Sequence, residues 1–371
     1  MQIDLIPLHH SPSGTTRTLR VHRFGQPGAR PKAYIQAALH ADELPGVLVA
    51  HQLIALLTDA EVKGDLVGEV VVVPAANPIG LSQEFLGIHH GRFALSDGFN
   101  FNRGFADVSR GLHEAVAKST ARPGQDVSEV LRSHFRDAVQ QHKANSESAM
   151  LKSQLLTLAI DADVVLDLHC DGEAVMHLYT LPSLSTRIAP LARLLGAAVC
   201  LTATESGEGP FDEACSRPWQ VAQAAMPTAM LSTPCLAATV ELRGERDVSP
   251  LLAKQDAHAI LEFLKVEGVV DGAPPTLPNH GYLVLSLAAT DPVIAPTSGV
   301  LVFDCELGAR VVQGAVIAHL LDPVTGQSTA VNAGTSGLLF ARAASRWASA
   351  GKRIGKIAGS EIIRSGKLLS P

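Results

Sequence analysis

The 371-residue sequence has little net charge of either sign and no long hydrophobic run. Its 30 Lys and Arg residues are outnumbered by 36 Asp and Glu residues, so no basic excess is present to neutralise phosphate groups. No uninterrupted apolar stretch reaches the roughly 18 residues that a membrane-spanning helix requires. We therefore expect neither a nucleic-acid partner nor a membrane span.

Cysteine is also sparse, and the five cysteines lie far apart without a Cys-x-x-Cys pair. An odd, scattered set in a chain of this length is typical of reduced thiols. The first twelve residues lack the basic region and long apolar run of a secretory signal. The expected location is the cytoplasm.

Apolar residues make up 46% of the chain, which is enough to bury a large core and excludes global disorder. In residues 1–285, continuous apolar runs alternate with segments of helical periodicity. Strands are expected at 33–39, 69–74, 163–168, 197–202 and 238–242, and helices at 45–57, 127–141, 150–160 and 249–265. This alternation predicts an α/β domain with a mixed, largely parallel sheet flanked by helices.

Residues 286–371 have a different pattern, with short β-branched runs separated by glycine and proline. This spacing of turn signals predicts a smaller all-β domain. The segment resembles the barrel-sandwich domains of lipoyl and biotinyl carriers. Such carriers need a lysine at a hairpin tip, but no lysine occurs between Lys265 and Lys352. We therefore expect this domain to cap the active site or to mediate assembly rather than to act as a carrier.

The first candidate for chemistry is His40-Ala41-Asp42-Glu43, at the end of the first expected buried strand. Ligands bind open α/β sheets beyond the carboxyl ends of the strands, where this turn would direct His40 and Glu43. An imidazole and a carboxylate suit zinc, which in hydrolases takes three protein ligands and keeps one position open. A His-x-x-Glu pair arises readily by chance, so its value depends on a third ligand.

His169 is the candidate third ligand, because it follows directly on another expected buried strand. A single histidine at such a position is more often structural than metal-bound. Two strand ends of one sheet that together offer two histidines and a glutamate favour a metal site. Asp167 lies on the same strand face as His169 and is a candidate to orient its ring, although a plain surface or turn carboxylate is the alternative.

Glu241 is a carboxylate inside an otherwise apolar expected strand, where a buried glutamate is rare without a partner or a function. Beside a metal site it would serve as a general base. The alternative is a plain ion pair with Arg243 or Arg246. Asn102 and Arg103, on a loop after the second expected strand, form a donor pair that suits a substrate carboxylate, unless the dipeptide is simply solvated.

Together, the His-x-x-Glu motif, the Asn-Arg dipeptide, the strand-end histidine and the strand glutamate resemble the succinylglutamate desuccinylase/aspartoacylase family, which is related to the zinc carboxypeptidases. The four elements agree with the family in their order along the chain. The resemblance implies a zinc-carboxypeptidase-like fold with one Zn²⁺ held by His40, Glu43 and His169. It also implies that Glu241 is the general base.

The same resemblance assigns Asn102 and Arg103 to the substrate carboxylate and makes Arg92 the candidate that polarises the scissile carbonyl. In the family the dipeptide is usually followed by an aromatic residue and a proline. Here residues 104–106 read Gly-Phe-Ala, which puts the loop shape in doubt but not the ligands.

The expected function is that of a zinc-dependent hydrolase that cleaves the amide bond of an N-acylated amino acid or a related small molecule. One alternative is a metallocarboxypeptidase that acts on peptide C-termini. A more distant alternative is a metal-free, non-catalytic binding protein with the same fold. A homo-oligomer is compatible with the sequence, and substrate contacts are expected from loops 86–98 and 205–215.

Overall fold

The computed structural model describes residues 1–8, 14–112, 114, 126–228 and 230–369 of the chain. The larger part is a nine-stranded mixed sheet with helices on both faces, and the smaller part consists of antiparallel sheets formed by the C-terminal residues. This arrangement agrees with the predicted α/β fold and its C-terminal β region. The predicted boundary falls at β12 (Leu283–Ser286), which still belongs to the large sheet.

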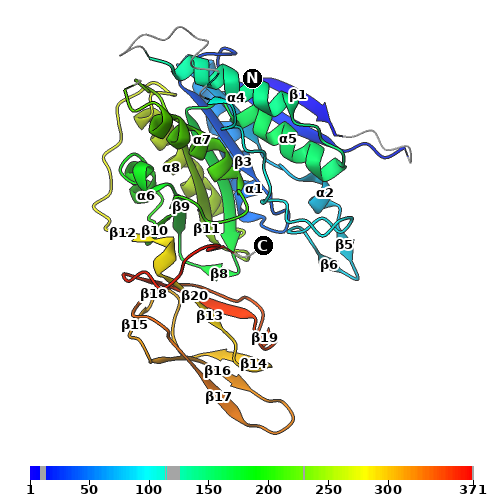
Figure 1. Cartoon of the computed structure of the whole chain (residues 1–371), viewed down its shortest axis with the longest axis vertical. Helices are drawn as coiled ribbons and strands as arrows, with labels where there is room; N and C mark the ends of the chain where they lie inside the picture. Colours follow the sequence, from blue (N-terminus) through cyan, green and yellow to red (C-terminus); the bar gives the residue numbers. More distant parts are fainter. Residues whose placement is uncertain (9–13, 113, 115–125, 229, 370–371) are drawn as a thin grey trace.

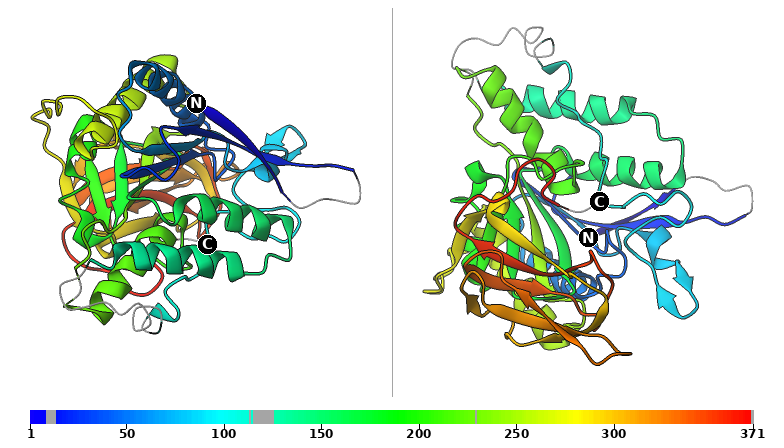
Figure 2. Two further views of the ribbon diagram at one scale, coloured as in Figure 1. Left: turned by 90° about the horizontal axis from the view of Figure 1, so that it is seen from above. Right: turned by 60° about the horizontal axis from the view of Figure 1, so that its bottom comes forward.

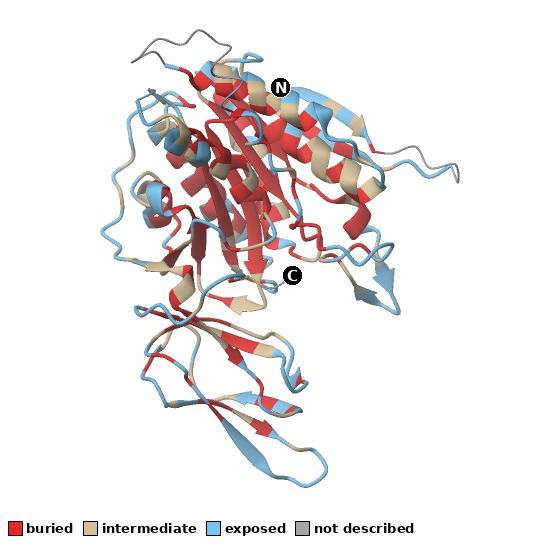
Figure 3. Cartoon of the chain, in the orientation of Figure 1, coloured by how far each residue is buried: buried red, intermediate tan, exposed pale blue. Residues whose placement is uncertain are grey.

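The nine strands lie in the order β1-β2-β4-β3-β7-β11-β9-β10-β12. Parallel pairing joins β4, β3, β7 and β11 at the centre, whereas β9 runs antiparallel to β11. The central strands are almost entirely buried, as Figure 3 shows, which explains their continuous apolar sequences. The bounds are β1 (Gln2–Pro7), β2 (Thr18–Phe24), β3 (Lys32–Ala37), β4 (Glu69–Val73), β7 (Val164–Asp171), β9 (His177–Thr180), β10 (Val199–Thr202) and β11 (Leu236–Gly244).

Alternate side chains of the strands form two cores, one on each face of the sheet. Along β3, Ala33 and Ile35 belong to the core that also contains residues of α1 (Pro45–Lys63), α6 (Ala189–Leu194) and α8 (Pro250–Val266). Tyr34 points to the opposite core, which is covered by α4 (Ser128–Gln141), α5 (Glu147–Ala159) and α7 (Phe211–Ala225). Figure 2 shows the helices on both sides of the sheet. Because successive side chains of a strand point to opposite faces of the sheet, both faces are apolar and both are covered by helices. The result is a three-layer sandwich of helices, sheet and helices.

The C-terminal residues form two antiparallel sheets that share one apolar core. One has the order β13-β20-β18-β15 and also takes in β8 (Glu173–Ala174), which pairs with β18. The other has the order β17-β16-β14-β19. The bounds are β13 (Thr290–Ile294), β14 (Gly299–Phe303), β15 (Arg310–Val311), β16 (Val316–Leu321), β17 (Ser328–Asn332), β18 (Gly337–Arg342), β19 (Trp347–Ala348) and β20 (Arg353–Gly359).

Each predicted strand and helix has a counterpart within a few residues, but the sequence analysis missed several elements. It did not predict α7, which contains an internal proline, Pro218. It also missed the edge pair β1–β2 and the short elements β5 (Glu84–Phe85), β6 (Ile88–His89), α2 (Pro78–Leu81), β8, β9 and α6. The first helix extends from its predicted end at 57 to Lys63 and ends at Gly64, whose φ of 82° suits glycine.

No helix in the described part of the chain is both long and apolar enough to cross a membrane.

Candidate active site

The three candidate metal ligands come from the carboxyl ends of two adjacent parallel strands. Ala37 at the end of β3 pairs with Leu168 of β7, so the chain that leaves β3 emerges beside His169. His40 and Glu43 lie in the turn between β3 and α1, and α1 begins at Pro45 as predicted. The fold thereby brings His169 next to Glu43, although the two residues are 126 positions apart in the sequence. Sequence spacing alone could not establish this contact.

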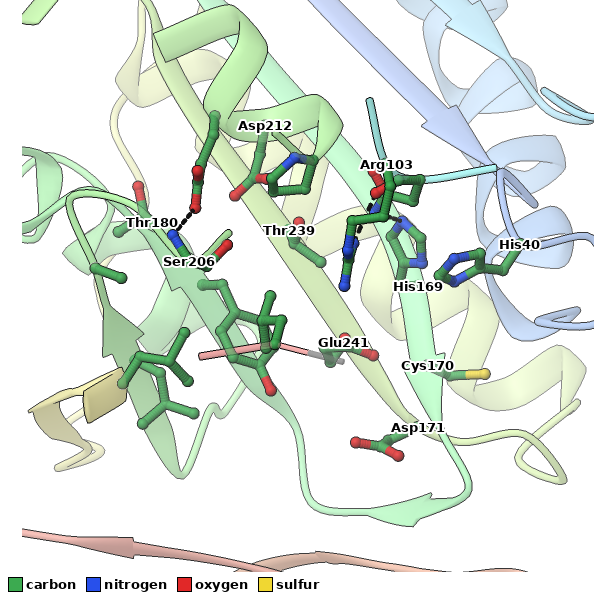
Figure 4. A pocket seen from close by; sticks show the side chains of 18 of the residues that line it. His40, Arg103, His169, Cys170, Asp171, Thr180, Ser206, Asp212, Thr239 and Glu241 are labelled. Atoms are coloured by element: carbon green, nitrogen blue, oxygen red, sulfur yellow. Dashed lines mark hydrogen bonds between the residues drawn. The ribbon is translucent and has the colours of Figure 1, made fainter. Parts of the chain in front are cut away.

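His40, Glu43 and His169 are all buried, and their candidate ligand atoms lie within 4.8 Å of one another. The two oxygens of Glu43 divide between the histidines. Oε1 lies 2.8 Å from Nδ1 of His40, and Oε2 lies 2.7 Å from Nδ1 of His169. Figure 4 shows the two imidazole rings side by side. Two nitrogens and one oxygen therefore face a common point, which is a donor set that a zinc ion prefers.

The outer nitrogen of each histidine contacts a hydrogen-bond acceptor. Nε2 of His40 lies 2.9 Å from Oδ1 of Asn100, and Nε2 of His169 lies 2.9 Å from Oδ2 of Asp167. Asp167 is fully buried and also accepts a hydrogen bond from Gln36. With a metal ion bound, these contacts would favour a proton on Nε2 and leave the Nδ1 lone pair of each histidine for the ion. Such an outer shell is typical of metal-binding histidines.

The electrostatics of the cluster favour a cation. Burial raises the pKa of Glu43, but the two imidazoles outweigh it and hold that pKa well below its usual value. Burial lowers the pKa of His169, but the carboxylates of Asp167 and Glu43 raise it well above its usual value. With no ion present, a proton on His169 balances two buried carboxylates, and a metal ion would take over that role.

Arg92 reaches the edge of this cluster because its neighbour Gly91 packs against the His-x-x-Glu turn. Gly91 accepts a hydrogen bond from the backbone of Ala41, and a Cβ atom on it would lie 2.0 Å from the nitrogen of Asp42. Nη1 of Arg92 then lies 3.2 Å from Oε1 of Glu43. The guanidinium is partly exposed and borders the cavity.

Asn102 and Arg103 are buried beside His169. Nδ2 of Asn102 lies 3.3 Å from Nε2 of His169, and its Oδ1 accepts a hydrogen bond from the backbone of Phe211 at 2.8 Å. Arg103 donates to the carbonyl of Asn102 and lines the cavity. Asn102 thus ties the start of α7 to the site, in addition to lying next to the candidate carboxylate-binding arginine.

Glu241 lies on β11, directly opposite His169 of β7 in the strand register. Its Oε2 atom is buried and has no hydrogen-bond partner among the residues that the structure describes. Burial, together with the negative charges of Glu43 and Asp171, raises the pKa of Glu241 to about 8. Among the described residues, Glu241 forms no ion pair with Arg243 or Arg246, and Arg243 pairs with Asp256. A carboxylate with an elevated pKa in a cavity wall is a candidate for proton transfer.

These side chains line one cavity, which is partly open to solvent. The loops 86–98 and 205–215 both contribute to its wall, the first through Arg92 and the second through Ser206, Pro210, Asp212 and Glu213. Arg353 and Lys356 of β20 also line it, so the C-terminal region takes part in the site.

Sequence reasoning missed several residues of this site. Asn100 could have been proposed from the sequence, because it lies two positions before the predicted site residue Asn102. Asp171 could have been proposed as well, since it follows His169 by two positions on the same strand. Tyr179, Arg353 and Lys356 could not, because only the packing of distant strands brings them to the cavity.

Three other histidines, His89, His90 and His177, do not line this cavity. His89 contacts the carbonyl of Gly80, and neither His89 nor His90 borders the cavity. His177 is fully buried and packs edge-on against Tyr179 and Phe340, and its Nε2 atom has no hydrogen-bond partner in the described part of the chain. Its role is therefore structural.

Burial lowers the pKa of His177 from 6.5 to about 4. Between those values the unfolded chain binds more protons than the folded one, so this residue makes stability rise with pH. We expect His177→Phe to remove this contribution, which is on the order of 3 kcal/mol over the full window. Denaturant unfolding at pH 4.5 and pH 7.5 measures it. The exposed His258→Phe serves as control, and an unchanged pH dependence in His177→Phe would contradict the assignment.

A family model for the succinylglutamate desuccinylase/aspartoacylase catalytic domain matches residues 29–266. A solved protein assigned to this family from Shewanella amazonensis is 24% identical, with a TM-score of 0.85 over 96% of this chain and 98% of its own. One from Shewanella frigidimarina is also 24% identical, with a TM-score of 0.84 over 96% and 97%.

The ectoine utilization protein EutE (DoeB) from Ruegeria pomeroyi is 18% identical, with a TM-score of 0.67 over 97% of this chain and 95% of its own. No protein with a curated function matches the sequence. At these identities the solved structures support the fold, and the family model covers well over half of the chain. The chain therefore belongs to the succinylglutamate desuccinylase/aspartoacylase family.

Proposed function

We propose that this protein is a zinc-dependent hydrolase that cleaves the amide bond of an N-acylated amino acid or a related small molecule. One observation carries the proposal: a buried His-Glu-His cluster, the carboxylate of Glu241 with its buried Oε2 atom, and a buried arginine all line the same cavity. Each group supplies a different requirement of amide hydrolysis, and membership of the family agrees with this chemistry.

His40, Glu43 and His169 are the residues that would hold zinc, since two imidazoles and a carboxylate leave one position open for a reactant. When bound, zinc supplies Lewis-acid chemistry, which activates water near neutral pH and stabilises negative charge on a carbonyl oxygen. Asn100 and Asp167 keep the two rings in the required tautomer and orientation.

Glu241 performs the proton transfers in this proposal. Its carboxylate takes a proton from the attacking water and returns it to the departing nitrogen, so the amine leaves as a neutral group. The unpartnered Oε2 atom is the natural acceptor, because no internal hydrogen bond competes for it. The raised pKa makes the carboxylate a stronger base than an exposed glutamate would be.

Arg103 and Asn102 position the substrate. The guanidinium of Arg103 offers a planar set of donors that matches a carboxylate, and burial strengthens such an interaction. Arg92 stands at the metal cluster, where it would donate to the carbonyl oxygen as negative charge develops there. In an N-acylated amino acid, the free carboxylate would bind Arg103, and the carbonyl oxygen of the acyl group would lie near Arg92.

The cavity wall favours small substrates over peptides. Leu287, Arg353, Lys356 and Leu369, which all follow the last strand of the large sheet, close part of the cavity. A substrate must fit within this wall, which we expect to favour a small molecule over a peptide.

A substrate screen tests the proposal. Zinc-loaded protein is incubated with acetyl, succinyl and formyl amino acids and with short peptides, and release of free amine is measured. We expect release from acyl amino acids, loss of activity with a chelator and recovery with zinc. Cleavage of peptides alone would indicate a carboxypeptidase. Protein that neither binds zinc nor hydrolyses any of these compounds would overturn the proposal.

A further inference from the structure

A group of exposed apolar side chains lies on a hairpin that the proposed reaction does not use. β5 and β6 form a two-stranded sheet of their own and pair with no other strand in the described part of the chain. Figures 1 and 2 show this hairpin projecting from the body of the large sheet. The exposed fractions are 62% for Phe85, 85% for Leu86 and 60% for Ile88. A two-stranded hairpin without further packing is at best marginally stable in water, so we expect another surface to cover it.

The turn of this hairpin carries a leucine where the backbone favours other residue types. Leu86 and Gly87 are its two central residues, and their φ angles are 51° and 73°. Positive φ at both positions is the geometry of a type I′ turn, in which asparagine, aspartate or glycine is preferred at the first position. A leucine with this φ is strained, and an outlier of this kind is a reason to look for a function. An apolar contact with another surface is the function that an exposed leucine at a hairpin tip supports.

Two further apolar side chains extend this surface at the base of the hairpin. Gln83 donates a hydrogen bond to the carbonyl of Phe93 at 2.8 Å, and its Oε1 accepts one from the backbone of Leu95, also at 2.8 Å. Phe93 is 40% exposed and Leu95 is 61% exposed. We use the name hairpin patch for the five apolar residues Phe85, Leu86, Ile88, Phe93 and Leu95.

The area of the hairpin patch matches what one subunit contributes to a stable interface. A large apolar side chain has an area of roughly 170–200 Å², so at these exposed fractions the five side chains present about 500–600 Å² to solvent. A standard interface buries about 800 Å² on each partner, and about 60% of that area is apolar. The hairpin patch therefore supplies the apolar share of such an interface. It also lies at the upper end of the range for exposed apolar patches on soluble monomers.

The charge of the hairpin patch suits a second copy of this chain. In a two-fold symmetric dimer the same surface faces itself, so a patch with a net charge would repel its copy. Residues 83–95 contain one acidic residue, Glu84, and one basic residue, Arg92, whose guanidinium contacts Glu43 of the metal cluster. Charge therefore does not oppose the self-contact. An anionic membrane or a nucleic acid would instead need a cluster of basic residues, which this segment lacks.

We propose that the hairpin patch is the contact surface of a two-fold symmetric dimer, in which the hairpins of two copies of this chain pack against each other. The inference does not depend on the proposed function, because none of the five side chains lines the cavity or takes a step in the reaction. It places the dimer contact in the segment that carries Arg92, to which the hydrogen bonds of Gln83 connect the hairpin.

Sedimentation velocity of the full-length protein over a wide range of concentrations tests the association. We expect a reversible dimer with twice the mass of the chain. In Leu86→Asn we expect the dissociation constant to rise by at least about 100-fold, because each symmetric dimer loses two buried leucine side chains. Asparagine favours the type I′ turn, so the hairpin should remain folded in this variant. Wild-type protein that is monomeric at every concentration would overturn the proposal.

Val324→Asn is the matched control. Val324 is 91% exposed and lies in the turn between β16 and β17, so the variant removes a similar amount of exposed apolar surface at a different hairpin. We expect it to dimerise with the wild-type dissociation constant. If Leu86→Asn and Ile88→Thr both dimerise like the wild type, the interface lies elsewhere and the proposal is wrong.

Hydrogen–deuterium exchange locates the contact without a substitution. The amides of residues 84–89 should exchange more slowly above the dissociation constant than well below it, whereas those of residues 322–327 should not change. A dimer in which residues 84–89 exchange equally fast at both concentrations contradicts the proposal. Protein that stays monomeric and binds phospholipid vesicles through the hairpin also contradicts it, since a membrane would then be the partner.

Discussion

Glu241→Gln is expected to lower kcat by about 10²- to 10⁴-fold, the contribution typical of a positioned acid–base group, while bound zinc is retained. The amide has nearly the same shape as the carboxylate but cannot accept the proton of the attacking water. Since Glu241 is not among the three clustered ligand residues, the metal content should not change. Steady-state kinetics and metal analysis of the same preparation measure both effects.

Glu245→Gln provides the matched control for this variant. Glu245 lies four positions later, is exposed and does not line the cavity, so its loss should leave kcat within about twofold of the wild type. A Glu241→Gln variant that keeps most of its turnover would remove Glu241 from the proton-transfer role, whatever its metal content.

His40→Ala is expected to lose both bound zinc and hydrolysis. Since loss of an outer-shell partner already lowers metal affinity by about 10- to 100-fold, loss of a ligand should lower it by more than about 100-fold. The variant removes the nitrogen that faces Glu43 and His169, and the described residues place no third histidine in the cluster to replace it. Metal analysis after dialysis against a weak chelator measures the affinity.

His258→Ala is the control, because His258 is exposed on α8 and does not belong to the cluster. It should retain zinc and activity. Circular dichroism of His40→Ala tests whether the fold persists. We expect that it does, because His40 belongs to neither apolar core of the large sheet. A folded His40→Ala protein with a full complement of zinc would exclude His40 as a ligand.

Much of the α/β fold followed from local patterns. The run 164–168 is apolar at nearly every position because β7 is covered by helices on both faces, and the same holds for β3 and β4. The missed elements have local reasons. Pro218 interrupts the pattern of α7, and β1 is an edge strand whose residues are mostly exposed, so neither segment shows the apolar run of a core element.

For the site, the sequence determined which groups lie at strand ends, because strand length and the following turn are local properties. His40, His169 and Glu241 were identified in this way, and their order along the chain matched a known family. Only the tertiary structure decided that β3, β7 and β11 are neighbours, and therefore that these three side chains meet. Strand order depends on long-range packing, which no local pattern encodes.

The tertiary structure alone also decided what surrounds the reacting groups. Asp212 and Glu213 look like an ordinary acidic first turn in the sequence, and only the packing of α7 against the sheet buries them in the cavity wall. Arg353 and Lys356 reach the same cavity from the C-terminal sheet. Burial sets the energy of a charge, and burial is a property of the assembled chain, which is why the charges around the candidate site could be read only from the tertiary structure.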